Sequence, residues 1–343
     1  MIRRTACLIA RGSDPCHNLA IEKQLMDTLP ESTAILFLSQ SDHAIVMGRN
    51  QNPWHECKVE SFLESGGIIT RRLSGGGAFY QDEGCLNFSF IMPKTDFDIG
   101  RQTGVLNAAL SPFGVRGEMS YGGRMVSGGR YFCRNAFYKS GSGAIHHGTL
   151  FVNAAMDIME HYLKPRTGNA PAPESAATGV SAVNLRELNS DISAEGLERT
   201  LYQAFSAFLR SQPAWLDERM MDQRTLSALT QQFSDPEWVY PKKVNYDFTV
   251  SERFPWGGVT VLLLREGGVI RAARIFSDAM EAALFLPIQQ GLVGCPFLIG
   301  AITTRFEQKL ELLRDPRLLQ IAGDVCTLIC GRIRAMDRGG QEV

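Results

Sequence analysis

Residues 71–90 read Arg-Arg-Leu-Ser-Gly-Gly-Gly-Ala-Phe-Tyr-Gln-Asp-Glu-Gly-Cys-Leu-Asn-Phe-Ser-Phe: a pair of arginines, a triple-glycine turn and an alternating apolar run. The glycines permit positive φ and leave no side chain between the backbone amides and a ligand. Successive amides can form a concave anion site, and Arg72 can add a planar fork for a carboxylate or phosphate. A hairpin turn with two surface arginines is the alternative interpretation. The length and order of the block favour a binding loop.

Further motifs surround this block in a fixed order. They are Asn18-Leu19-Ala20-Ile21-Glu22, Met47-Gly48-Arg49-Asn50-Gln51-Asn52-Pro53-Trp54, His146-His147-Gly148-Thr149-Leu150 and Ser251-Glu252-Arg253-Phe254-Pro255-Trp256-Gly257-Gly258. Together with residues 71–90 they resemble the lipoate–protein ligases, in the wider family that includes biotin protein ligases and octanoyltransferases. The resemblance spans nearly the whole chain, and the set of motifs is highly specific.

The resemblance implies an α+β fold, with a mixed-sheet biotin/lipoate-ligase-like catalytic domain and a smaller C-terminal α+β accessory domain. A chain of 343 residues also favours two domains, because single cores stop growing beyond about 250–300 residues. The segment EWVYPKK at 237–243 is the expected crossover. We therefore predict a catalytic domain over residues 1–245 and an accessory domain over residues 246–343.

The hydrophobic pattern predicts strands and helices in mixed order, without a regular βαβ repeat. Expected helices cover residues 15–29, 97–110, 154–163, 194–210 and 216–233. Expected strands cover residues 33–38, 43–47, 68–72, 86–92, 130–138 and 144–153, with 68–72 and 86–92 flanking the glycine loop at a sheet edge. Residues 168–181 are rich in Ala, Pro, Gly, Ser and Thr, and this composition predicts a mobile loop. The accessory domain is expected to contain a hairpin, 259–264 with 269–276, and two terminal apolar helical segments.

The composition is that of an ordinary enzyme. The formal net charge of −1 and the pI near 6.6 give no general attraction to nucleic acid. The eight scattered cysteines form no paired CxxC pattern, and reduced thiols fit a cytoplasmic protein. No secretory signal is evident, and the most apolar stretch, 283–302, is interrupted by two prolines and two glutamines. We expect a cytoplasmic protein that binds neither nucleic acid nor membrane.

The resemblance implies ATP-dependent activation of lipoate to lipoyl-adenylate, followed by transfer of the lipoyl group to a lysine of a lipoyl domain. The partners would be lipoyl domains of 2-oxoacid dehydrogenase complexes or the glycine cleavage H protein. ATP with Mg²⁺ would be the co-substrate pair and lipoate the substrate, with no metal site independent of the nucleotide. Such a site must hold a carboxylate close to an α-phosphate and keep water from a mixed anhydride.

The resemblance also assigns site residues. Arg72 is expected to contact the nucleotide or the acyl-adenylate, and the segment after the turn is expected to contact the nucleotide. Sheet core is the alternative role for Phe79 or Tyr80, and structural hydrogen bonding is the alternative for either histidine of the His-His-Gly-Thr motif. The predicted ATP and lipoyl-adenylate site consists of Arg72, Gly76, Gly77, Ala78, Phe79, Tyr80, His147 and Thr149.

One departure concerns the family's activating lysine. Counting back from His146-His147-Gly148-Thr149 without a gap puts Tyr131 at the lysine position, and a gapped alignment would put Met125 there. Tyr131 can donate a hydrogen bond but does not replace an ammonium charge. Strand alternation predicts that Arg130 faces away from Tyr131 and that Lys139 and Tyr131 face the same way. The simpler interpretation is that neither cation fully substitutes.

Two neighbouring motifs also depart from the family pattern. Residues 121–124, Tyr-Gly-Gly-Arg, lack the carboxylate of the usual Gly-Arg-Asn-Asp motif, and residues 179–185 lack the basic residues of the adenylate-binding loop. These departures affect activation or closure around the adenylate. They leave open an impaired homologue that binds lipoyl-adenylate or a lipoyl domain.

A second enzyme class is an ATP-independent lipoyl or octanoyl transferase that works through a cysteine thioester. Cys85 and Cys133 are the candidate nucleophiles, and strand alternation gives Cys133 the same facing as Tyr131. Such a thiol needs thiolate stabilisation or a positioned base. The ligase-type accessory domain favours a ligase and a packing role for both thiols.

Overall fold

The computed structural model describes residues 2–120, 122–164, 181–242, 244–310 and 314–338. In this part of the chain the larger domain is built on an eight-stranded sheet with the order β11-β1-β2-β6-β10-β9-β8-β7. Strand β1 runs parallel to β2 and β11, and the other neighbours are antiparallel, so the sheet is mixed as predicted. The strands are β1 (Arg4–Ile9), β2 (Thr33–Ser39), β6 (Cys85–Pro93), β7 (Glu118–Ser120), β8 (Arg124–Ser127), β9 (Arg130–Ser140), β10 (Gly143–Phe151) and β11 (Ala214–Trp215).

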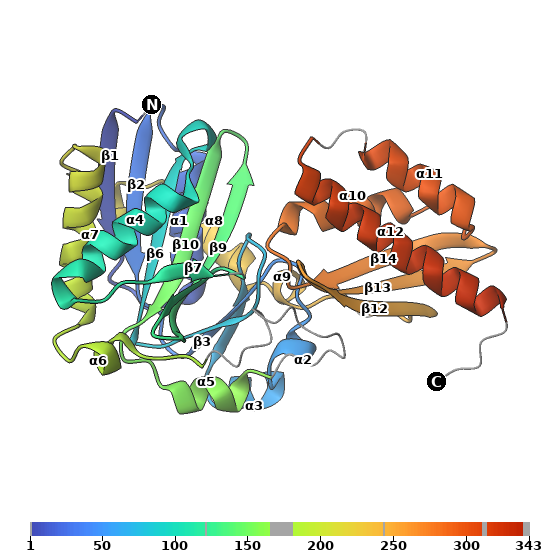
Figure 1. Cartoon of the computed structure of the whole chain (residues 1–343), viewed down its shortest axis with the longest axis horizontal. Coiled ribbons are helices and arrows are strands. Elements are labelled where there is room, and N and C mark those ends of the chain that lie inside the picture. The colour runs from blue at the N-terminus through green and yellow to red at the C-terminus, as the bar shows by residue number, and fades with distance from the viewer. Residues whose placement is uncertain (1, 121, 165–180, 243, 311–313, 339–343) are drawn as a thin grey trace.

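Helices cover both faces of this sheet (Figure 1). Helices α4 (Ile99–Leu110) and α7 (Ala194–Leu209) pack on one face, over Phe88 and Phe90 of β6. Helices α1 (Pro15–Asp27) and α8 (Gln223–Ser234) pack on the other. Each of these helices begins at a side chain that accepts a hydrogen bond from a first-turn amide, which stabilises a helix start; the caps are Asp14, Asp98, Ser193 and Asp222.

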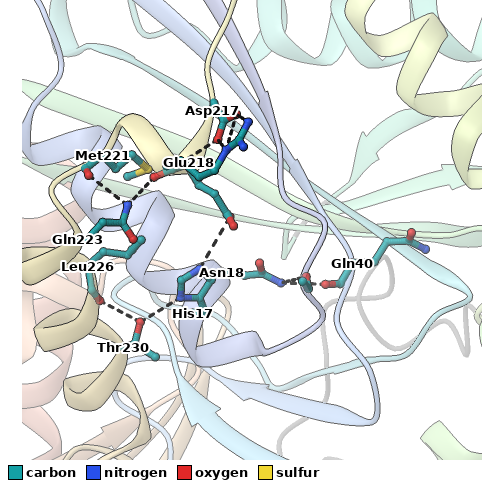
Figure 2. A network of polar contacts seen from close by, with 11 residues as sticks. His17, Asn18, Gln40, Asp217, Glu218, Met221, Gln223, Leu226 and Thr230 are labelled. Atoms are coloured by element: carbon teal, nitrogen blue, oxygen red, sulfur yellow. Dashed lines mark hydrogen bonds and ion pairs between the residues drawn. The ribbon is translucent and has the colours of Figure 1, made fainter.

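Polar contacts fix the start of α1 against the segment that leads into α8 (Figure 2). The His17 imidazole lies 3.3 Å from the Thr230 hydroxyl and 3.8 Å from the Glu218 carboxylate. Asn18 Nδ2 donates to the Gln40 carbonyl at 2.8 Å, which ties α1 to the turn after β2. Helix α1 therefore has a fixed position along the sheet.

The glycine loop belongs to a separate small sheet and not to the edge of the large one. Within the described residues this sheet has the order β4-β3-β5, formed by β3 (Ala44–Met47), β4 (Ile68–Arg71) and β5 (Phe79–Gln81). The expectation that strands 68–72 and 86–92 flank the loop was wrong, because residues 79–81 form their own strand against β3. Short helices surround this sheet: α2 (Pro53–Glu56), α3 (Val59–Glu64), α5 (Met156–Tyr162), α6 (Leu185–Leu188) and α9 (Pro236–Val239).

The smaller C-terminal domain combines an antiparallel sheet with helices. Its strands are β12 (Phe248–Phe254), β13 (Gly257–Glu266) and β14 (Val269–Ser277), and β13 and β14 form the predicted hairpin. The chain ends in α10 (Ala282–Leu292), α11 (Ile299–Leu310) and α12 (Pro316–Asp337), so the apolar stretch from 283 belongs to packed helices. Within the described residues, no helix combines the length and apolar character needed to cross a bilayer.

The smaller domain contacts the glycine loop directly. Gly76 N–H donates to the Ala279 carbonyl at 2.9 Å, and Ser277 N–H donates to the Asn50 carbonyl at 2.8 Å. Asn50 Nδ2 donates in turn to the Ala282 carbonyl at 3.0 Å. The segment between β14 and α10 therefore covers the loop on the side that faces the smaller domain.

Candidate active site

A small, half-open cavity lies where α1 crosses the large sheet beside the glycine loop. Of the residues predicted from sequence, it brings together Arg72, Phe79, His147 and Thr149, and Glu22 of α1 completes one wall. Its volume is about 50 Å³, well below the roughly 300–1,000 Å³ of typical ligand pockets. A ligand of that class enters only if lining side chains move.

A chain of hydrogen bonds runs along the cavity wall. Arg72 Nε donates to Ser74 Oγ at 2.9 Å, and Ser74 Oγ lies 2.6 Å from His147 Nε2. His147 Nδ1 lies 2.7 Å from the Glu22 carboxylate, which also accepts from Ser89 Oγ at 2.5 Å. Every member is buried, so the chain links one cation, one imidazole and one carboxylate in a low-dielectric setting.

The Glu22 carboxylate is held in its charged form. Burial favours the neutral acid, but the neighbouring His147 imidazole, the Ser89 hydroxyl and the Arg72 charge outweigh it. Together they lower the pKa of Glu22 below its ordinary value. The negative charge of Glu22 therefore lies next to His147 Nδ1 and partly compensates the positive charge of Arg72.

Arg72 is a buried scaffold residue as well as a cavity residue. Its side chain is only 2% exposed. Besides Ser74, the guanidinium donates to the Val46, Gly75 and Gly77 carbonyls at 2.9, 2.6 and 2.8 Å. It also lies 4.1 Å from the centre of the Phe79 ring. Arg72 therefore holds the glycine loop in its turn, and its contact with nucleotide stays a prediction.

Arg71 rules out a plain surface turn for this block. Its Nη1 donates to the Gly48 and Gln51 carbonyls, both at 2.8 Å, and burial lowers the pKa of its guanidinium to about 9. The side chain is 3% exposed, so both arginines of the pair point into the protein. The block is an internal framework that closes the cavity.

The remaining loop residues lie beside the cavity. The Gly76 amide is bound by Ala279 of the smaller domain, and Gly76 has a φ of +85°, which favours glycine. The Gly77 carbonyl accepts from Arg72, and the Ala78 carbonyl accepts from Arg134 Nη1 at 2.8 Å. The loop therefore presents carbonyls to arginines in this structure.

Tyr80 and Tyr131 lie apart from the cavity wall, in the core around the small sheet. Tyr80 follows Phe79 on β5 and so points to the opposite face, where its hydroxyl lies 3.4 Å from His43 Nδ1. Tyr131 packs in the same core, 5.9 Å from the Phe151 ring, and is 8% exposed. Of Phe79 and Tyr80, it is therefore Tyr80 that has the sheet-core role considered from sequence.

A β-bulge in β9 overturns the facing predicted for the strand. Met125 pairs with Cys133 and Val126 with Tyr131, so Phe132 is an extra residue with no partner position on β8. Phe132 and Cys133 both pack in the core under α4 and α7, whereas Tyr131 lies on the other side of the sheet. The predicted common facing of Tyr131 and Cys133 was therefore wrong.

Both cations considered from sequence as substitutes for the lysine lie away from the cavity. The Lys139 ammonium lies over the Phe97 ring at 4.8 Å, on the α4 face, so its predicted common facing with Tyr131 was also wrong. Arg130 pairs with Glu187 at 3.2 Å on the surface. Neither side chain reaches the cavity.

The sequence interpretation missed Arg134. In the β9–β10 pairing it lies opposite Thr149, which lines the cavity, and its guanidinium lies 5.4 Å from the Tyr131 ring. Arg124 of β8 pairs with Arg134 and lies 5.0 Å from the same ring. The hairpin turn at 140–143 sets this register, so counting pairs outward from it would have found Arg134.

The other motif residues have structural surroundings. His146 points to the α4 face, where its Nδ1 lies 3.0 Å from Gln102 Oε1 and its Nε2 lies 2.9 Å from Asn135 Oδ1. Burial of the ring, and to a smaller extent the charge of His147, lower the pKa of His146 to about 3. The segment after residue 180 returns beside Tyr131, where Val183 N–H donates to the Tyr131 carbonyl at 2.9 Å. Most of the loop predicted at 168–181 lies outside the described residues.

Both candidate cysteine nucleophiles are fully buried. Burial raises the pKa of the Cys85 and Cys133 thiols well above the ordinary value, so neither is a thiolate at neutral pH.

We predict that Cys133→Ala leaves lipoyl transfer within about twofold of the parent, since only packing changes. Time courses of acceptor modification would measure this, with iodoacetamide labelling of the native protein as a check. A complete loss of transfer with folding intact would restore the thioester route.

Comparison with known proteins agrees with this architecture. The family described as "Lipoyl protein ligase A/B catalytic domain" matches residues 14–206, and the family described as "Bacterial lipoate protein ligase C-terminus" matches residues 243–312. A lipoate-protein ligase A from Psychrobacter cryohalolentis is 31% identical over 330 residues, which cover 94% of this chain and 96% of that protein.

Solved structures show the same fold. The P. falciparum protein LipL1 in complex with lipoate has a TM-score of 0.80 at 21% identity, over 94% of this chain and 99% of that one. A lipoate-protein ligase A bound with ATP has a TM-score of 0.56 at 20% identity, over 69% and 98%. A bipartite ligase from Thermoplasma acidophilum, studied with its E2 lipoyl domain, has a TM-score of 0.57 at 20% identity, over 71% and 100%. With both family matches and a relative above 30% identity along nearly its whole length, this chain belongs to the lipoate–protein ligase family.

Proposed function

We propose that this protein is a lipoate–protein ligase that activates lipoate with ATP and transfers the lipoyl group to a lysine of a lipoyl domain. The full-length relationship to a lipoate-protein ligase A carries the proposal, since it includes the smaller domain as well as the catalytic one. The mostly buried side chains that line the cavity beside the glycine loop would shield an acyl tail from water. The cysteine-dependent and non-enzymatic alternatives have no comparable support.

The chemistry has two steps. A lipoate carboxylate oxygen attacks the α-phosphorus of ATP, and the bond to pyrophosphate breaks. The amine of the acceptor lysine then attacks the acyl carbon, so that an amide forms, AMP leaves and one proton is released. Mg²⁺ bound with ATP would screen the phosphates. The Arg72–Ser74–His147–Glu22 chain would hold the cavity wall and the glycine loop in place during both steps.

The partners and setting follow from the same proposal. The acceptors would be lipoyl domains of 2-oxoacid dehydrogenase complexes or the glycine cleavage H protein. We propose residues 1–245 as the catalytic domain and residues 246–343 as the accessory domain. A cytoplasmic setting is supported by the cysteines, all eight of which are free thiols.

The test is a reaction of the purified full chain with ATP, lipoate and a lipoyl domain, read by intact mass. A lipoyl mass shift that requires ATP supports the ligase, and a lipoyl domain with its acceptor lysine replaced by arginine is the control. Modification only from a preformed acyl donor would indicate a transferase. Binding without modification under any of these conditions would indicate a non-enzymatic homologue.

A further inference from the structure

The proposed function brings two anions together, because a carboxylate must approach an α-phosphate. A preorganised cation at that place stabilises the transition state strongly. Within the described residues no lysine lines the cavity, and Tyr131 occupies the position that the family resemblance gives to one. We propose that Arg134 is the catalytic cation of adenylation in this protein. This inference rests on the proposed function and names the residue that performs its first step.

The bulge at Phe132 is what brings Arg134 and Tyr131 to one side of the sheet. In a regular strand these two residues would face opposite ways, since they are three positions apart. The extra residue reverses the facing of everything beyond it, so that Tyr131 shares a face with Arg134. The bulge therefore brings the positive charge of Arg134 to the face of Tyr131, the position where the family resemblance expects a lysine.

One strand pairing and two side-chain contacts place Arg134 beside the cavity and the glycine loop. Its backbone lies opposite Thr149 on β10, and Thr149 lines the cavity. Its Nη1 donates to the Ala78 carbonyl at 2.8 Å, just where the loop enters β5. Its Cζ lies 5.7 Å from the centre of the Phe79 ring, which also lines the cavity. Arg134 is thus adjacent to both the acyl cavity and the predicted nucleotide segment.

Arg124 places a second positive charge beside Arg134. Arg124 and Arg134 are direct cross-strand partners on β8 and β9, and both guanidiniums lie within 5.4 Å of the centre of the Tyr131 ring. The Tyr131 ring supplies a face on which both cations rest, so two positive charges gather next to the predicted nucleotide segment.

The other arginines around the loop support its turn or lie farther from the cavity. Arg72 donates to two loop carbonyls, to the Val46 carbonyl of β3 and to Ser74, and Arg71 is bound within the framework around Gly48. Arg124 lies one strand farther from the cavity than Arg134. An arginine also keeps its charge when half-buried and can bind two oxygens with one planar fork. Arg134 can therefore bridge the attacking carboxylate and the α-phosphate.

The test compares Arg134→Gln with Arg130→Gln in the full chain. The second variant makes the same change four residues away, at a surface ion pair. The measurement is lipoate-dependent release of pyrophosphate from ATP. Arg134→Gln is expected to lose about 10²–10³-fold in rate, the usual effect of removing one transition-state donor. Arg130→Gln should stay within about twofold, because exposed pairs contribute little.

Charge restoration separates an electrostatic role from a structural one. The double variant Arg134→Gln/Tyr131→Lys should recover at least about tenfold over Arg134→Gln, because an ammonium returns to the same face. Transfer from synthetic lipoyl-adenylate to a lipoyl domain should fall much less than pyrophosphate release in Arg134→Gln. If that variant does not fold, Arg134→Lys, which keeps the charge, replaces it and should retain adenylation within about tenfold.

The outcomes are distinct. Pyrophosphate release unchanged in Arg134→Gln, or equally lost in Arg130→Gln, overturns the role of Arg134 and leaves the ligase intact. Equal losses of adenylation and of transfer from lipoyl-adenylate, with no recovery in the double variant, also overturn it. A parent protein that releases no pyrophosphate and modifies no lipoyl domain overturns the proposed function together with this inference.

Discussion

Replacing Arg72 with alanine is expected to destroy adenylation and to lower the free energy of unfolding by about 3–5 kcal/mol, the usual cost of breaking a buried charge network. The change leaves the Val46, Gly75 and Gly77 carbonyls without their arginine donor, and it leaves the Glu22 carboxylate with less positive charge nearby. The glycine loop then loses the hydrogen bonds that Arg72 makes to Ser74, Gly75 and Gly77. Urea unfolding and lipoate-dependent pyrophosphate release measure the two effects. Arg219→Ala, on an exposed side chain, is the matched control and should unfold like the parent.

The pH dependence of that loss follows from Glu22. Its pKa in the folded protein is lowered, so its ionisation stabilises the fold at neutral pH and this contribution is lost as the pH falls through the folded pKa. Removing Arg72 raises the folded pKa toward the unfolded value, so the acid loss of stability from Glu22 should be smaller and complete at a higher pH than in the parent. An Arg72→Ala protein that is stable but inactive would show that Arg72 mainly contacts ligand. A protein that is both stable and active would contradict both roles.

Motif order predicted the residues of the cavity better than strand geometry did. Arg72, His147 and Thr149 come from segments about 75 residues apart, and the register of their motifs was enough to place them together. The hydrogen-bond chain was not predictable in the same way. Glu22 lies 125 residues from His147 along the chain. A pattern along the sequence shows that Glu22 is in a helix, but not which strand that helix crosses.

Strand β9 shows where alternation fails. The rule that successive side chains point to opposite faces gave Cys133 and Lys139 the same facing as Tyr131 and overlooked Arg134. A single extra residue, Phe132, reverses that assignment. Nothing in the residue types at 131–134 marks a bulge, because all four are acceptable in a regular strand. The bulge becomes visible only when β8 and β10 fix the register from both sides.

Gly48 is the second position where a small change should have a large effect. A Cβ added there would lie 2.0 Å from the Gly76 carbonyl oxygen and 3.0 Å from its carbon, so backbone and not a flexible side chain would have to move. Arg49 N–H also donates to the Ser74 carbonyl at 2.8 Å at this crossing. We expect Gly48→Ala to lower the free energy of unfolding by about 1–3 kcal/mol through overpacking. Displacement of the loop should reduce adenylation by about 10²-fold.

The matched control for Gly48→Ala has the opposite expected sign. Gly104 lies within α4, where an added Cβ meets only the Phe208 ring at an ordinary 3.9 Å. Gly104→Ala should therefore raise the free energy of unfolding by about 0.5–1 kcal/mol, because alanine favours a helix interior, and adenylation should be unchanged. Urea unfolding of both variants, with pyrophosphate release at saturating ATP, compares them. Equal and small effects would mean that the glycine loop lies farther from β3 in solution, and that the Arg71–Gly48–Gly76 crossing does not set its position.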